Sequence, residues 1–313
     1  MHIGIQQEAC DNCPPMSRFE PHAQARRRAA RLIGLLSRLP LPLLYGISDL
    51  LFLLLFHVLR FQRRLIVGNL TRAFPDKSGT EIRKLAARSY RRALDFLFET
   101  IKAWRFDTEA LRRHVLIENP ELLSELLRRH KVVVALTSHC GNWEWLQLAC
   151  AAQLDARLAA VYNPLNHPGV DALLLELRER FGSTLVDAGN ALPALIGFAR
   201  EGGVIALNAD QGPRPEDDKY WSDFLGIETA FFTGPEKLAR LFKAPVVFVA
   251  VQRLRRGCFR VCFQHLSQPP YHQAAGEIMQ PYVEAVQRQI RRAPEDWFWL
   301  YKRWKYKKPL YAD

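Results

Sequence analysis

Short apolar runs alternate with helical stretches through the C-terminal two thirds of the chain. Six runs have the apolar and β-branched character of strands: "KVVVALTS", "ARLAAVY", "STLVD", "GVIALNAD", "PVVFVAVQRL" and "FRVCFQHL". Segments 143–153, 170–181 and 191–201 lie between the earlier runs and have helical periodicity. This alternation predicts an α/β fold with a mostly parallel sheet flanked by helices. Only the turn 255–257 separates the last two runs, which predicts an antiparallel hairpin at the sheet edge.

The N-terminal third has a different pattern. Residues 79–104 have apolar positions at helical spacing and predict an amphipathic helix. Residues 41–59 are mostly Leu and Phe and approach the roughly 20 residues that span a bilayer. Asp49 interrupts this run, and arginines flank it on both sides, whereas a spanning helix has a one-sided excess. We therefore expect a helix in the headgroup plane, or a shallow hairpin broken at the leading prolines; a buried soluble helix and a single span are the alternatives.

These patterns divide the chain into three regions. Residues 1–24 lack the pattern of a signal peptide and are predicted to be a disordered leader. Residues 25–115 form a membrane-associated helical region, and residues 116–313 form the α/β region. The pair Cys10-x-x-Cys13 is interpreted as incidental thiols, with a metal or redox site as the alternative. The cysteine spacing does not suggest a disulfide framework, so we expect a reducing compartment.

The composition excludes a disordered chain and indicates an acidic partner. Hydrophobic residues make up 49% of the 313 residues, which is typical of a folded protein. The net charge of +12 suits anionic lipid headgroups, an acidic carrier protein or nucleic acid, and composition alone does not choose among them.

One strand end carries a dense set of polar side chains. The run "KVVVALTS" leads into "HCGNWEW", where His139 and Glu144 form an H-x4-E pattern. Asn142 is a candidate N-cap for the following helix, with Glu144 in its first turn. We expect Glu144 to bond to one imidazole nitrogen of His139 and leave the other free to accept a proton from a substrate hydroxyl. Gly141 lets the backbone approach a ligand, and N–H groups at the helix start are candidates to stabilise an oxyanion. A purely structural His–Glu bond is the alternative.

The same spacing occurs a second time, in a different context. His272 and Glu277 follow two prolines in a turn, and no strand precedes them. We interpret this second copy as a solvated surface pair.

An ordered set of motifs resembles one family. "LTSHCGNWEW", "VYNP", "NADQGP", "YWSDFLGIETAFFTGPEKLARLFKAPVVFVAV" and "EDWFWLYKRWK" together are similar to the lipid A late acyltransferases, lysophospholipid acyltransferase-like enzymes that include lauroyl and myristoyl transferases. The resemblance covers roughly residues 30 to 308. It implies a membrane-bound enzyme that moves a fatty acyl group from acyl carrier protein to a hydroxyl of a lipid precursor, without a metal or another cofactor. It also implies that His139 is the base, that Glu144 orients it, and that 116–313 is the catalytic region.

The chain departs from the family pattern at Asn163. Members generally carry Arg or Lys at this position of "VYNP", where a cation suits a phosphate or a developing oxyanion. Asn163 therefore favours an aminolipid or another less anionic acceptor over phosphorylated lipid A.

Other residues are candidates for the wall of the site. Asp210 and Gln211 close a strand, where a simple Asx turn is the alternative to a role in supporting the base or the acceptor. Thr233 is a candidate N-cap for a helix starting at Gly234, and such a helix start is also suited to bind a thioester oxygen. Cys140 is a weaker alternative as an acyl-carrying nucleophile, because adjacent residues rarely face each other.

The aromatic and basic tail completes the prediction. "DWFWLYKRWKYKK" has the composition of a headgroup interface, and no nucleic-acid motif accompanies it. The resemblance, together with the charge and the apolar N-terminal helices, implies an O-acyltransferase on the cytoplasmic face of a bacterial inner membrane, with acyl carrier protein, a lipid acceptor and anionic lipids as partners and no nucleic acid. The alternatives are a basic membrane-surface or nucleic-acid-binding protein without catalysis, and a lipid hydrolase that uses the same His–Glu pair.

Overall fold

The computed structural model describes residues 20–272 and 276–306. Most of the predicted leader, with Cys10 and Cys13, lies outside the described residues, but a helix begins at Glu20, inside the predicted leader. The helices are α1 (Glu20–Leu36), α2 (Leu41–Phe52), the π-helical η2 (Leu53–Val58), α3 (Arg63–Ala73), α4 (Gly79–Ala103), α5 (Thr108–His114), α6 (Pro120–Arg129), α7 (Trp143–Gln153), α8 (Pro168–Glu179), the 3-10 turn η3 (Ala188–Asn190), α9 (Ala191–Glu201), α10 (Gly234–Phe242), α11 (Met279–Arg292) and the 3-10 turn η4 (Pro294–Asp296). The strands are β1 (Val115–Ile117), β2 (Val132–Thr137), β3 (Leu158–Tyr162), β4 (Thr184–Asp187), β5 (Gly203–Asn208), β6 (Lys219–Phe224), β7 (Ile227–Phe232), β8 (Val246–Arg255) and β9 (Cys258–Ser267).

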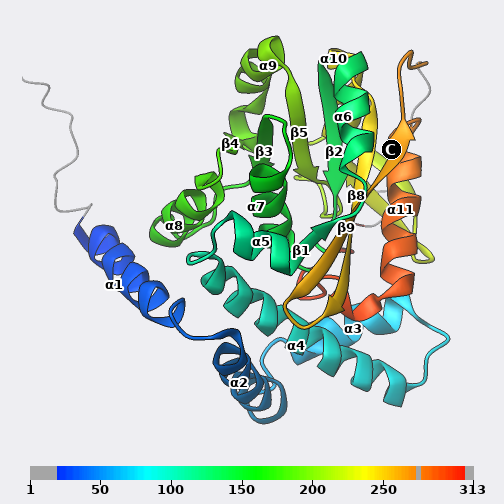
Figure 1. Ribbon diagram of the computed structural model, residues 1–313. Helices are drawn as coiled ribbons and strands as arrows, with labels where there is room; N and C mark the ends of the chain where they lie inside the picture. Colours follow the sequence, from blue (N-terminus) through cyan, green and yellow to red (C-terminus); the bar gives the residue numbers. More distant parts are fainter. Residues whose placement is uncertain (1–19, 273–275, 307–313) are drawn as a thin grey trace, which may run out of the picture.

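A seven-stranded sheet in the order β1-β9-β8-β2-β5-β3-β4 forms the centre of the molecule (Figure 1). All neighbouring pairs are parallel except β8–β9, which confirms the predicted α/β fold, the six predicted strands and the hairpin. The hairpin is not at the edge, however, because β1 pairs with β9 outside it. Neither β1 nor the separate β6–β7 hairpin was predicted. β1 has only three residues, too few to show a period.

Two apolar cores lie on the two faces of this sheet. Val132, Val134 and Leu136 of β2 point into a core shared with α3, α4, α9, α10 and α11, whereas Val133 and Ala135 point into a core shared with α5, α6, α7 and α8. Successive strand residues alternate between the faces, and helices cover both faces, so β2 is buried throughout. The central strand therefore provides a rigid support for whatever follows its carboxyl end.

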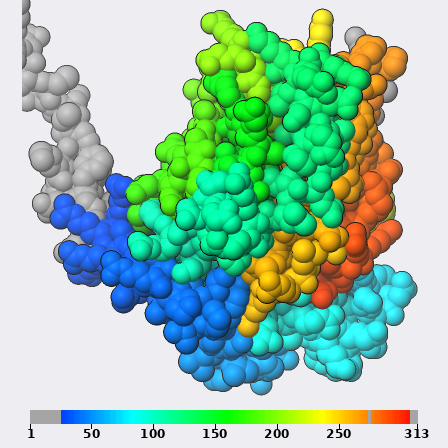
Figure 2. All heavy atoms as spheres, viewed as in Figure 1, coloured from blue at the N-terminus to red at the C-terminus, as the bar shows by residue number. Residues whose placement is uncertain are grey.

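The N-terminal helices pack along one border of the molecule, where Figure 2 shows α2 to the start of α4 in blue to cyan. Within the described residues, one helical stretch, Leu41–Val58, is long and apolar enough to cross a membrane by length and composition, and 22% of it is buried against the protein. Asp49 in this stretch pairs with Arg256 at 2.8 Å and Arg91 at 2.7 Å, and hydrogen bonds from these arginines hold the pKa of its carboxyl well below the usual range. Asp49 is thus bound both to α4 and to the turn between β8 and β9.

The structure of the C-terminal tail, residues 296–306, contradicts the predicted headgroup interface. Trp297, Trp299 and Arg303 were predicted at a headgroup interface, but all three side chains are buried. Trp297 and Trp299 pack edge to face at 4.6 Å between ring centroids and belong to the core beside α3 and α11. Aromatic residues mixed with cations look alike in sequence whether the rings face lipid or a core. The last two lysines of the tail lie outside the described residues.

Candidate active site

The loop between β2 and α7 carries His139. Gly141 adopts a left-handed backbone conformation (φ +62°) that turns the chain after β2 towards α7. Asn142 caps the helix, as predicted, by accepting a hydrogen bond from the N–H of Trp145 at 2.9 Å. This places His139 just past the carboxyl end of the central strand, where open parallel sheets bind their ligands.

The imidazole of His139 is held by Asp210, which follows the neighbouring strand β5. Nδ1 of His139 lies 2.6 Å from Oδ1 of Asp210, and the backbone N–H of His139 donates to Oδ2 at 2.9 Å. Thr137 and Asn208 are paired in the sheet, so the two side chains follow matching strand ends. Trp297 Nε1 also donates to Oδ2 of Asp210, at 2.6 Å. Because a carboxylate only accepts, it places the imidazole N–H on Nδ1 and leaves a lone pair on Nε2.

The electrostatics of this pair suit a base. The Asp210 side chain is fully buried (0% exposed), and burial alone raises its pKa, but the charge and hydrogen bonds of His139 and the hydrogen bond from Trp297 outweigh burial and hold the pKa below its usual value. The imidazole of His139 is 17% exposed, so its free edge is accessible. Nδ2 of Asn208 lies 3.4 Å from Nε2, as expected for an amide donor facing a nitrogen lone pair. The site thus presents the Nε2 edge of an imidazole that a buried carboxylate holds at Nδ1.

Glu144 does not orient His139, which corrects the sequence prediction. Its carboxylate binds Arg178 of α8 in a bidentate pair, with Nε to Oε2 at 2.8 Å and Nη2 to Oε1 at 2.6 Å. Glu144 is 3% exposed and Arg178 is 16% exposed, so the pair is largely dry. The planar guanidinium satisfies both carboxylate oxygens at once, and the end of β5 brings Asp210 to His139 more directly than the first turn of α7 brings Glu144.

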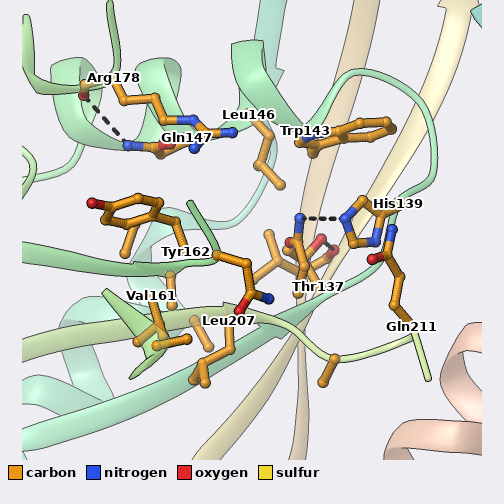
Figure 3. Close-up of a pocket in the computed structure, with 18 of the residues that line it drawn as sticks. Thr137, His139, Trp143, Leu146, Gln147, Val161, Tyr162, Arg178, Leu207 and Gln211 are labelled. Atoms are coloured by element: carbon orange, nitrogen blue, oxygen red, sulfur yellow. Dashed lines mark hydrogen bonds between the residues drawn. The ribbon is translucent and has the colours of Figure 1, made fainter. Parts of the chain in front are cut away.

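A cavity of about 610 Å³ begins at His139 and runs between α7 and the sheet. Figure 3 shows His139, Trp143 and Gln211 at one end of the view and Tyr162, Gln147 and Arg178 at the other. The deeper lining is apolar and comes from α6, α7, β2, β3, β5, β8 and β9: Leu123, Ala135, Leu146, Cys150, Leu154, Leu158, Val204, Ala206, Val249 and Phe263. A polar end that leads into an apolar interior suits a substrate with a reactive group at the end of a hydrocarbon chain.

Asn163 and Gln211 line the cavity, but Asn163 does not leave its wall without a cation. Oδ1 of Asn163 accepts a hydrogen bond from Nη2 of Arg214 at 2.7 Å, and Arg214 also lines the cavity. A guanidinium from the loop after β5 therefore lies where the resemblance led us to expect a cation within "VYNP". The inference of a less anionic acceptor loses its basis.

Three other candidates do not line this cavity. Gly141 packs against the protein rather than a ligand: its N–H donates to the carbonyl of Asp296 at 2.8 Å, and an added Cβ would lie 2.9 Å from Val251. That N–H is therefore already hydrogen-bonded within the protein and is not available to an oxyanion. Thr233 makes no capping hydrogen bond with its side chain, and the ring of Phe232 covers Gly234. Phe232, not the helix start behind it, contributes to the cavity wall.

Cys140 is not placed to act as a nucleophile. Its side chain is buried and does not line the cavity, and burial raises the pKa of its thiol well above the ordinary value. The reactive form of a cysteine is the thiolate, so this environment keeps Cys140 inert.

Sequence reasoning missed Arg178, Arg214 and Trp297. Arg178 lies in a segment correctly predicted as helical, but nothing in the spacing connects it to Glu144. The pairing of His139 with Asp210 could have been predicted, because the sequence places both residues at the carboxyl ends of strands.

The comparisons with known proteins identify a family. Residues 18–306 match the model of the bacterial lipid A biosynthesis acyltransferase family. The lipid A biosynthesis lauroyltransferase of Escherichia coli (strain K12) is 23% identical over 280 residues, which is 88% of this chain and 89% of that protein. The lipid A biosynthesis palmitoleoyltransferase of the same organism is 22% identical over 238 residues, or 76% of each chain. With its fold, cavity and strand-end histidine, the chain belongs to the bacterial lipid A biosynthesis acyltransferase family.

Proposed function

We propose that the protein transfers a fatty acyl chain from the thioester of acyl carrier protein to a hydroxyl of a lipid A precursor, with His139 as the general base. The observation that carries the proposal is the imidazole whose Nδ1 is held by buried Asp210 at 2.6 Å, beside an apolar cavity. The names of the relatives support lipid A as the acceptor class.

The proposed reaction needs one base and no redox partner. Nε2 of His139 accepts the proton of the acceptor hydroxyl as its oxygen bonds to the thioester carbonyl carbon. Asp210 stabilises the imidazolium that forms. The tetrahedral intermediate then breaks its C–S bond, the imidazolium returns the proton to the leaving thiolate, and an ester and a free carrier thiol result.

The cavity suits the acyl chain of the donor. From Trp143 to Leu154, the α7 side of the cavity is ~16 Å long at the helical rise per residue. At about 1.2 Å per bond of an extended chain, this length holds roughly a dozen bonds. Each methylene buried there adds about 0.8 kcal/mol of binding free energy.

Arg214 supports a phosphorylated acceptor. It is exposed and lines the same cavity as His139, and an Arg–phosphate pair adds bidentate hydrogen bonds to charge attraction. Replacing Arg214 with Gln should raise KM for a phosphorylated acceptor and leave KM for an unphosphorylated one unaffected; equal KM changes for both acceptors would contradict a phosphate contact of Arg214.

The N-terminal helices support attachment to the cytoplasmic face of a bacterial inner membrane. Apolar side chains are exposed on α1, on α2 and around η2: Leu32, Leu35, Leu43, Leu50, Leu53, Leu54, Val58, Leu59 and Phe61. Arginines flank them on both sides, which suits anionic headgroups, and the net charge of +12 also suits an acidic carrier. High-salt washing should release only part of the protein from membranes, because the apolar contacts persist; complete release would indicate purely electrostatic attachment.

The test is product analysis by mass spectrometry. The purified full chain is incubated with lauroyl-acyl carrier protein and a phosphorylated lipid A precursor. Acylated acceptor and free carrier thiol are expected in equal amounts. Free fatty acid in place of acylated acceptor would indicate a hydrolase that uses the same base, and no turnover of any acyl thioester would indicate a non-catalytic membrane protein.

A further inference from the structure

Arg303 is a buried cation without a carboxylate partner in the described part of the chain. Its side chain is 1% exposed. Nη2 donates to the carbonyl of Ala230 at 2.9 Å, and the guanidinium lies 4.4 Å from the ring centroid of Phe231 and 5.6 Å from that of Phe224. Nε has no hydrogen-bond partner. Buried arginines are almost always paired, so this one calls for a compensating charge.

The charge of Asp210 acts on Arg303. Arg303 lies against the loop that follows Asp210, since a Cβ added at Gly212 would be 3.7 Å from its Nη1. Trp297, which donates to Asp210, packs edge to face on Phe224 under the guanidinium. Burial lowers the pKa of Arg303 to about 10, and the charge of Asp210 opposes that decrease, so Arg303 stays protonated at neutral pH.

We propose that Arg303 is a positioning residue that acts through Asp210, as the buried counter-charge of the His139–Asp210 pair. This deepens the proposed function and rests on it. The guanidinium balances the carboxylate that holds His139, and it opposes uptake of a second proton by the pair. The pair then keeps its base form to a lower pH than it would beside a neutral side chain.

Other titratable groups around the pair do not replace this charge. Tyr282 of α11 and Cys140 are buried, and burial raises the pKa of both well above their ordinary values, so both are neutral near pH 7. Tyr301 faces Arg303 near Gly212. On the other side of the loop, Asp296 lies 3.3 Å from Arg92, and Arg253 also acts on it, so its charge is locally offset.

The first test is the pH dependence of transfer by the full chain. In Arg303→Gln, the acid limb of kcat/KM should move up by about one pH unit, because the neutral side chain no longer opposes uptake of a proton by the pair. Arg303→Lys should restore most of the shift. Lys302→Gln is the matched control, because it removes an exposed, screened charge from the same segment and should leave the limb in place. An unshifted limb in a folded Arg303→Gln protein would overturn the proposal.

A second test does not depend on activity or on the folding of Arg303→Gln. If Arg303 balances Asp210, then Asp210→Asn leaves a buried uncompensated cation. The double variant Asp210→Asn/Arg303→Met should therefore unfold at a higher temperature than Asp210→Asn alone. A lower unfolding temperature would refute the pairing even if no acceptor is ever found, whereas pairing without transfer activity would refute only the proposed function.

Discussion

The chain contains two His-x4-Glu pairs, and the two histidines lie in opposite environments. His139 follows a buried central strand, is 17% exposed and bonds at 2.6 Å to a buried carboxylate. His272 is 85% exposed, and its Nδ1 lies 3.4 Å from Glu277. The second pair is on the surface, as its sequence context predicted, and Glu277 is shared with Arg240. Identical spacing thus gives one candidate base and one solvated pair.

The difference teaches that the strand context, not the spacing, selects the functional copy. Even in the first copy the motif glutamate does not touch the histidine. Glu144 holds Arg178 at the cavity wall, and the partner of His139 comes from the next strand in the sheet. Only the surface copy forms the direct His–Glu contact that the spacing suggests.

Removing the imidazole should have the largest effect. His139→Ala should lower the transfer rate by at least ~10², because a general base contributes that much, while the protein remains folded. Single-turnover transfer on protein verified by thermal unfolding measures this loss. A variant that keeps more than a tenth of the rate would remove the proposed distinction between the two histidines.

Replacing Asp210 should lower the transfer rate less than replacing His139. Asp210→Asn can present the wrong hydrogen-bonding group to Nδ1 and leaves the imidazolium without a carboxylate, so kcat should fall by about 10- to 100-fold with little change in KM. An unchanged kcat would mean that Asp210 only supports the fold.

Glu144→Gln should lower the free energy of unfolding and raise KM. It leaves the largely buried Arg178 unpaired, which should lower the free energy of unfolding by about 3 kcal/mol. In the folded fraction, KM should rise more than kcat falls, because Arg178 lines the cavity and does not touch His139. Urea unfolding and steady-state kinetics separate the two effects, and a pure kcat loss would return Glu144 to the role of orienting the base.

Acid should weaken the fold through Asp210 in a predictable direction. Its folded pKa is depressed, so its stabilising contribution is fully present above the unfolded pKa of about 3.9 and is lost as pH falls through the folded pKa. Urea unfolding of wild type and Asp210→Asn between pH 2 and 6 measures this. The variant should lose less stability on the acid side, and parallel curves would contradict the depressed pKa.

His272→Ala should have the smallest effect. The side chain is exposed, so its removal should change the free energy of unfolding by no more than about 0.5 kcal/mol and leave transfer unchanged. A loss comparable to that of His139→Ala would show that the spacing itself carries function.

The sequence predicted the architecture better than the contacts. Alternating apolar runs located six strands of the main sheet and the helices between them, because burial on both faces leaves a strong signal. The pairing of Asp210 with His139 depends on which strands are neighbours, and strand order does not show in local periodicity. The tail was wrongly predicted at a headgroup interface, because Trp299 and Arg303 resemble interfacial residues until the core they fill is known. The prediction of a less anionic acceptor from Asn163 lost its basis because the cation beside Asn163, Arg214, comes from another loop.

The most direct test is proton NMR of the His139 imidazole in specifically ¹⁵N-histidine-labelled protein. We predict a downfield Nδ1 proton that exchanges slowly because Asp210 buries and accepts it. The resonance should be present in wild type, Glu144→Gln and His272→Ala, and absent in His139→Ala. In Asp210→Asn it should move upfield or disappear. A resonance that persists unchanged in Asp210→Asn and is lost in Glu144→Gln would contradict the account.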